Sequence, residues 1–252
     1  MNKTTLTATV LVVAALGLIY VEMAEREAQL VQSMVSLDKR YIPALALTSA
    51  QKLEPSRKAM TRLLEEWESF RESHKGMQKQ DSAWQADMER IEQLFLSAQK
   101  QLATDGELHN AHEELEQVRV ILLGVRERNG IDYFVDHLTR FHEPMEQIVM
   151  QVKGKSPTQL NAQDVAALQQ QLGMASTLWQ MVITTPVDKN LYGFSAQKMK
   201  QIDGLMREEK AALVHLQGAL ELGSNEKIIQ AALGVKPAFA QMFKLFGDFD
   251  GL

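Results

Sequence analysis

The stretch HNAHEELEQVRVILLGVRERNGIDYFVDHLTRFHEPMEQI, residues 109–148, decides the fold class of this chain. Before Asn129, apolar residues recur every three or four positions, which is the spacing of one face of an α-helix. Asn129 and Gly130 then supply a helix stop. A second apolar stripe with the same spacing runs from Ile131 to Val152. The stretch therefore predicts two helices that fold back on each other as an antiparallel hairpin.

The sequence pattern of the rest of the chain after Val21 also predicts helix. Ala, Leu, Glu, Gln, Lys and Met dominate it, and alternating strand patterns are absent. Glycines and prolines divide it into predicted helices near 20–41, 55–75, 80–104, 107–128, 131–152, 161–184 and 195–221, with a broken pair within 225–246. No long low-complexity linker interrupts residues 25–252, which favours one compact unit. We expect an all-α fold, an elongated up-and-down helical bundle.

The amino terminus carries an uncharged segment of 18 residues, from Thr4 to Val21. A helix needs roughly 17–25 such residues to cross a bilayer. A signal-peptidase cut after Ala24 would place Glu22 where a small residue is needed. We therefore expect residues 1–24 to form a transmembrane anchor, with a signal helix as the alternative. Lys3 before the segment, and mainly acidic residues after it, predict a cytoplasmic amino terminus.

This topology predicts a protein of the bacterial inner membrane with its bulk in the periplasm. If the amino-terminal segment is cleaved, the protein would instead be soluble in the periplasm. In either case we expect the bulk of the chain, residues 25–252, to be extracytoplasmic, and the membrane to be a partner through the amino-terminal helix.

Composition removes several functional classes. The 252 residues include no cysteine, which excludes disulfides, Cys-ligated zinc, iron–sulfur clusters and covalent c-type haem. The formal charge of −5 lacks the basic excess typical of nucleic-acid-binding proteins, so we expect no nucleic-acid partner. No nucleophile elbow, phosphate-binding glycine loop or Ser/His/Asp arrangement is recognisable. We therefore expect a non-enzymatic protein.

Histidines concentrate in the predicted hairpin, where four of the six fall between positions 109 and 142. Folding the chain about Asn129 and Gly130 places position 112 opposite about 147 and position 116 opposite about 143. Side chains four apart on a helix share a face. Two imidazoles, two carboxylates and a thioether would then meet, which suits Zn, Cu, Ni or Fe. The predicted metal ligands are His109, His112, Glu116, His142, Met145 and Glu146.

Two other interpretations of these residues remain open. His112 lies on an apolar stripe and could be a core histidine bonded to Glu116 or Glu146. The same neighbours would also suit a pH-sensing cluster. The spacing matches neither the H-E-x-x-H motif nor the paired E-x-x-H set of di-iron bundles. A haem site using His215 and Met174 is disfavoured, since the methionines fall mostly on apolar faces and read as core.

The carboxyl end is rich in phenylalanine: Phe239, Phe243, Phe246 and Phe249. One interpretation is a short helix that plugs the end of the bundle, and the other is a docking face for an envelope protein partner. Two functions follow from the whole sequence. The first is binding or sensing of a transition-metal ion by a membrane-anchored bundle, and the alternative is a metal-free scaffold or adaptor for other cell-envelope proteins.

Overall fold

The structure is all-α. The computed structural model describes the backbone of residues 3–79, 81–103 and 107–252, and the side chains of residues 25–77, 81–103 and 107–252. No strand occurs among these residues, so the predicted fold class is confirmed. The helices are α1 (Lys3–Ser49), α2 (Leu53–His74), η1 (Lys75–Lys79), α3 (Trp84–Ala103), α4 (Leu108–Arg128), α5 (Phe134–Val152), η2 (Pro157–Gln159), α6 (Ala162–Thr184), α7 (Lys189–Tyr192), α8 (Ala196–Leu222), α9 (Asn225–Leu233) and α10 (Lys236–Lys244).

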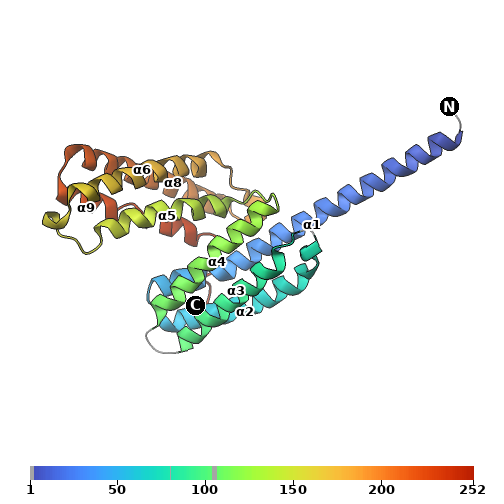
Figure 1. The fold of residues 1–252 in the computed structure, drawn as a ribbon, viewed down its shortest axis with the longest axis horizontal. Coiled ribbons are helices and arrows are strands. Elements are labelled where there is room, and N and C mark those ends of the chain that lie inside the picture. The colour runs from blue at the N-terminus through green and yellow to red at the C-terminus, as the bar shows by residue number, and fades with distance from the viewer. Residues whose placement is uncertain (1–2, 80, 104–106) are drawn as a thin grey trace.

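The helices pack as two groups that meet near the turn between α4 and α5 (Figure 1). In the amino-terminal group, α1 packs on α2 and α4, and α3 packs on α4. In the carboxy-terminal group, α5 packs on α6, and α8 contacts α6, α9 and α10. The bundle-like packing is as predicted, but the helices do not follow one common axis. Whether residues 25–252 behave as one compact unit stays a prediction.

Aromatic side chains mark the core of each group. Trp67 lies against Phe95 with ring centroids 5.3 Å apart in the amino-terminal group. Phe141 lies against Trp179 at 4.6 Å in the carboxy-terminal group. Buried apolar side chains of both groups form one continuous cluster, so the core runs through the contact between them. Burial of large aromatic surfaces is the main stabilising contribution expected here.

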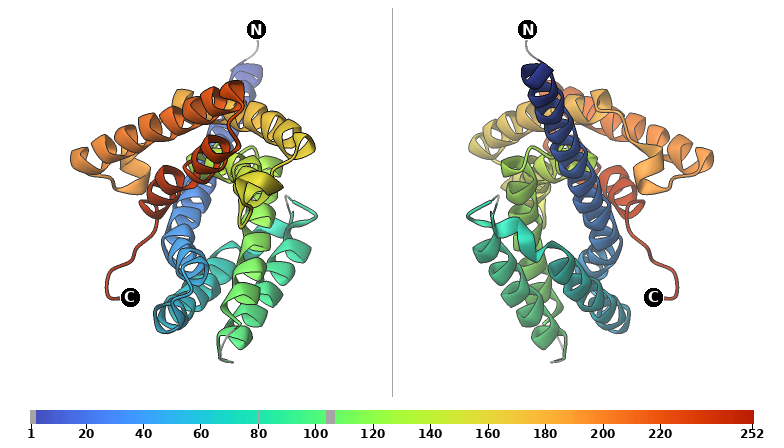
Figure 2. Two further views of the ribbon diagram at one scale, coloured as in Figure 1. Left: turned by 90° about the vertical axis from the view of Figure 1, so that its left-hand side faces the viewer. Right: turned by 90° about the vertical axis from the view of Figure 1, so that its right-hand side faces the viewer.

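Helix α1 does not end before Pro43, as the sequence pattern predicted; it continues to Ser49. A proline inside a helix cannot donate a hydrogen bond to the carbonyl four residues earlier, which here belongs to Lys39. That carbonyl accepts a hydrogen bond from the backbone N–H of Asp248 at 2.9 Å instead. The lost helical bond is thus replaced by a contact with the segment that follows α10, which lies 209 residues further along the chain and runs beside α1 (Figure 2).

The segment after α10 is fixed to the amino-terminal group at several points. Arg40 forms an ion pair with Asp248 at 2.8 Å, and the Arg62 guanidinium donates to the carbonyl of Asp250 at 2.6 Å. Gly247 lies close to the Pro43 region: a Cβ atom there would sit 2.9 Å from Ile42 Cγ2 and 3.0 Å from Pro43 Cδ. The close approach requires a residue without a side chain at position 247.

We expect Gly247→Ala to lower the free energy of unfolding by about 1–3 kcal/mol, because the added methyl group overlaps a packed contact. Urea unfolding followed by circular dichroism measures the change. Gly173→Ala is the matched control, since no described atom would lie within 4 Å of a Cβ at position 173 of α6. Equal free energies of unfolding for Gly247→Ala and wild type would contradict the close contact.

Several helix ends follow their sequence signals. Asn161 accepts hydrogen bonds from the backbone of Gln163 and Asp164 in a capping box. Gly130, Gly154 and Gly223 all adopt positive φ near helix ends, the backbone conformation that glycine tolerates best. Serine is a common residue at the start of a helix, yet within the described part of the chain Ser224 makes no side-chain capping bond at the start of α9. The short α7 was absent from the sequence prediction.

The amino-terminal part of α1 extends beyond the other helices (Figure 1). Among the residues whose side chains the structure describes, no helix is both long and apolar enough to cross a bilayer. The predicted anchor falls on residues 1–24, which lie outside the described side chains. The anchor therefore stays a prediction.

Candidate functional site

The predicted ligand residues lie where α4 and α5 face each other. The two helices diverge from their shared turn, with α4 running back along α3 and α5 along α6 (Figure 1). Glu116 of α4 nevertheless reaches His142 of α5, with 3.9 Å between Glu116 Oε2 and His142 Nδ1. This contact matches the register predicted from folding the chain about Asn129 and Gly130.

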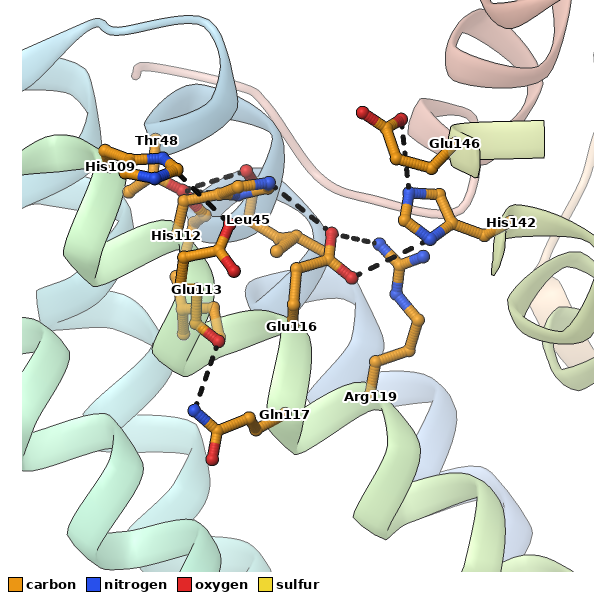
Figure 3. A network of polar contacts seen from close by, with 12 residues as sticks. Leu45, Thr48, His109, His112, Glu113, Glu116, Gln117, Arg119, His142 and Glu146 are labelled. Atoms are coloured by element: carbon orange, nitrogen blue, oxygen red, sulfur yellow. Dashed lines mark hydrogen bonds and ion pairs between the residues drawn. The ribbon is translucent and has the colours of Figure 1, made fainter. Parts of the chain in front are cut away.

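Glu116 is the centre of this arrangement (Figure 3). Its Oε1 atom lies 3.5 Å from His112 Nε2, one helical turn earlier. The same oxygen accepts a hydrogen bond from Arg119 Nη2 at 2.8 Å. Glu116 therefore contacts both predicted imidazoles and, in addition, a buried guanidinium.

The second carboxylate, Glu146, is also bonded to a cation. Lys236 at the start of α10 donates to Glu146 Oε2 at 2.7 Å, whereas His142 Nε2 is 4.0 Å from the same oxygen. We call His112, Glu116, Arg119, His142, Glu146 and Lys236 the histidine cluster. It links α4, α5 and α10, and thus joins the two groups of helices.

His112 also contacts α1. Its Nδ1 atom lies 3.4 Å from Thr48 Oγ1 (Figure 3). Thr48 itself donates to carbonyls one turn back in α1. The imidazole is therefore held from two helices, which is the setting of a partly buried histidine with satisfied nitrogens.

Burial dominates the electrostatics of the cluster. It lowers the pKa of His142 well below its ordinary value, and the charges of Arg119 and Lys236 lower it further. Burial also lowers the pKa of His112. The pKa of Glu116 is raised by burial, against the opposing effect of Arg119. Both imidazoles are thus neutral near pH 7, the state in which a histidine can serve as a metal ligand or an uncharged hydrogen-bonding group.

Two of the six predicted ligands do not join the others. His109 is exposed, and the contact described for it is with Glu113, at 4.0 Å. Met145 is fully buried among apolar core residues. Met145 lies in α5 three residues after His142, as predicted, but its side chain is on the buried face of that helix.

The described part of the chain contains no group of three or more His, Asp or Glu side chains arranged to hold a metal ion. Sequence spacing brought together His112, Glu116, His142 and Glu146, but it could not reveal which cations would join them. Arg119 has a local signal, since it lies three residues after Glu116 on the same helix. Lys236 is 90 residues from Glu146, and no spacing rule connects the two.

The phenylalanines near the carboxyl end are mostly buried. Phe239, Phe243 and Phe246 are each less than a tenth exposed. Phe246 stacks on Phe134 of α5, and the Arg119 guanidinium lies over the Phe243 ring at 5.0 Å. These contacts agree with the interpretation of the segment as a short helix that packs against the end of the bundle. Docking of an envelope protein through it stays a prediction, with these three rings already engaged in the core.

Comparison with models of protein families, with curated proteins and with solved structures finds no match to this chain.

Proposed function

We propose that this protein is a non-enzymatic scaffold or adaptor of the cell envelope, anchored by residues 1–24, in which the histidine cluster is a metal-free ion-pair network between the two groups of helices. One observation carries the proposal. Each carboxylate that could bind a metal is already bonded to a cation, Glu116 to Arg119 and Glu146 to Lys236.

The cost of releasing those cations supports this interpretation. The side chain of Arg119 is 5% exposed, so a metal that took over Glu116 would leave a buried guanidinium without its carboxylate. Removing one partner of a buried ion pair typically costs about 3–5 kcal/mol. A metal ion would have to offset this cost before it gained any affinity. Lys236 is more exposed and would be easier to displace.

A second candidate function, binding or sensing of Zn, Cu, Ni or Fe, keeps one observation in its favour. Glu116 lies between the two imidazoles, 3.5 Å from His112 Nε2 and 3.9 Å from His142 Nδ1. Ligand atoms about 2.0–2.1 Å from a tetrahedral metal are about 3.3 Å from one another. Both distances are longer than this, and different oxygens of Glu116 face the two imidazoles, so a metal ion would require these side chains to move and Arg119 to withdraw.

Thermal unfolding with and without Zn²⁺, Ni²⁺ or Cu²⁺ separates the two functions. A ligand that binds the native state raises the apparent stability by RT ln(1 + [L]/Kd), or about 2.7 kcal/mol at one hundred times Kd. The scaffold proposal predicts the same small metal-induced change of Tm in wild type, His112→Ala and the control His74→Ala. His74 lies on α2, outside the cluster.

A metal-induced rise of Tm in wild type and His74→Ala that is lost in His112→Ala would overturn the metal-free proposal. Comparing each variant with and without metal removes the direct effect of the substitution on stability. The anchor is tested separately by mass spectrometry of the protein extracted from membranes. An intact amino terminus is expected, and a chain that starts near residue 25 would contradict the anchor.

A further inference from the structure

A second polar cluster, distinct from the histidine cluster, is fully buried where the two groups of helices meet. Arg126 at the end of α4 donates to Asp136 of α5 from Nε at 2.9 Å and from Nη2 at 2.6 Å. Tyr133, in the turn between these helices, donates its hydroxyl to Asp38 of α1 at 2.8 Å. We call Asp38, Arg126, Tyr133 and Asp136 the arginine cluster.

The charges in this cluster do not balance. Arg126 is one cation facing two carboxylates, and its described hydrogen bonds all go to Asp136. The described partner of Asp38 is a neutral hydroxyl, although Asp38 is 4% exposed and Arg126 is 2% exposed. An ionised Asp38 therefore leaves a net negative charge in the interior, whereas a protonated Asp38 leaves the cluster neutral. Burying an uncompensated charge is strongly unfavourable.

We propose that the arginine cluster is a proton-operated joint: Asp38 takes up one proton when the two groups of helices are closed on each other, and its ionisation loosens their contact. The cluster draws residues from α1 and α4 on one side, and from α5 and the turn before it on the other. The inference does not depend on whether the histidine cluster binds metal, and it adds a regulated property to the scaffold.

The charged and titratable groups that face Asp38 shift its pKa in opposite directions. Arg126 and, more weakly, Arg119 of α4 favour its ionised form, as does the Tyr133 hydroxyl. Asp136 of α5 opposes ionisation. Tyr41 of α1 and Tyr192 of α7 are neutral, because burial raises the pKa of both phenols above their ordinary range. The balance leaves burial as the dominant influence, and it raises the pKa of Asp38 to about 6.

The direction of the pH effect follows from this shift. The folded protein retains the Asp38 proton up to about pH 6, while an unfolded aspartate loses it near 3.8. The native state thus binds more protons in this window, and stability falls as pH rises through it. His112 and His142 act in the opposite direction, because their lowered pKa values make protonation on acidification unfavourable. A variant at Asp38 isolates the aspartate contribution from theirs.

Resonance energy transfer between the two groups measures the opening directly. The chain has no cysteine, so Ser69→Cys on α2 and Gln170→Cys on α6 give two unique labelling positions, both exposed. In the full chain in detergent, we expect transfer efficiency to change with a midpoint near pH 6 between pH 4.5 and 8. Asp38→Asn should lose most of that change. Asp203→Asn, at an exposed position on α8, should retain all of it.

Tyr133→Phe is a second test variant, because a purely structural role of Tyr133 would not predict a shift in the pH midpoint. Removing the hydroxyl takes a hydrogen bond from the ionised form of Asp38, so the midpoint should move to higher pH. Circular dichroism establishes that each variant is folded. A wild-type protein with no change of transfer efficiency over this range, or an Asp38→Asn variant with the same change as Asp203→Asn, would overturn the proposal. An unmoved midpoint in Tyr133→Phe would also overturn it.

Discussion

Replacing Arg126 with alanine is expected to lower the free energy of unfolding by about 3–5 kcal/mol, the cost of breaking a buried ion pair from one side. The guanidinium makes a two-pronged contact with Asp136 and lies over the Tyr133 ring at 4.6 Å. Without it, the carboxylates of Asp38 and Asp136 share the interior with no cation from this position. The loss should therefore fall chiefly on the contact between the two groups of helices.

Urea unfolding monitored by tryptophan fluorescence measures this change, since Trp67, Trp84 and Trp179 are all buried. Arg207→Ala, at an exposed position on α8, serves as the control and should change stability by less than about 0.5 kcal/mol. The deficit of Arg126→Ala should shrink at acidic pH, where both aspartates can take up protons. If Arg126→Ala lost less free energy of unfolding than the control at neutral pH, Arg126 would not stabilise the contact between the two groups of helices.

Replacing Glu209 with glutamine should stabilise the protein at alkaline pH. Glu209 of α8 is fully buried, and its Oε2 accepts a hydrogen bond from the backbone N–H of Phe239, in the first turn of α10, at 3.1 Å. Its Oε1 has no hydrogen-bond partner among the side chains and backbone that the structure describes. Burial raises the pKa of this carboxyl from 4.5 to about 8, against the smaller effect of the Phe239 bond.

The sign and size of the effect follow from linkage. Between pH 4.5 and 8 the folded protein holds a proton that the unfolded chain has lost, so stability falls as pH rises through this window. A shift of this size corresponds to about 5 kcal/mol once the group is ionised in both states. Glutamine resembles the protonated acid and avoids the cost of ionisation, although its amide hydrogens also need partners. We expect a net gain of about 2–4 kcal/mol at pH 9.

Chemical unfolding at pH 5 and pH 9 tests this expectation. Glu209→Gln should differ little from wild type at pH 5 and be clearly more stable at pH 9. Glu208→Gln changes the exposed neighbouring residue and should show no comparable gain. If Glu209→Gln and Glu208→Gln changed the free energy of unfolding at pH 9 equally, the assignment of a neutral, buried carboxyl to Glu209 would be contradicted.

The sequence predicted the helices well because their signals are local. The three-and-four spacing of apolar residues, the stop at Gly130 and the capping box at Asn161 all act within a few residues of the helix ends they set. The end of α1 was predicted wrongly for a non-local reason. Pro43 is accommodated because the Lys39 carbonyl finds a donor at Asp248, which no local pattern reveals.

The candidate site shows the same division. Folding the chain at Asn129 and Gly130 was enough to place Glu116 against His142. The partners that determine the chemistry of the site came from elsewhere: Lys236 reaches Glu146 from α10. The arginine cluster escaped sequence reasoning because it assembles across α1, α4 and α5, and because buried ionisable residues look like surface residues in a helical sequence.

The metal content of the full chain, purified without chelator or affinity tag, tests the central claim most directly. The ion-pair interpretation of the histidine cluster predicts transition metal well below one ion per chain, and the same low content in His112→Ala and His74→Ala. The contrary result would be close to one Zn, Cu, Ni or Fe ion per chain in wild type and His74→Ala, with loss of that ion in His112→Ala. That outcome would show that Arg119 and Lys236 give way to a metal at Glu116 and Glu146.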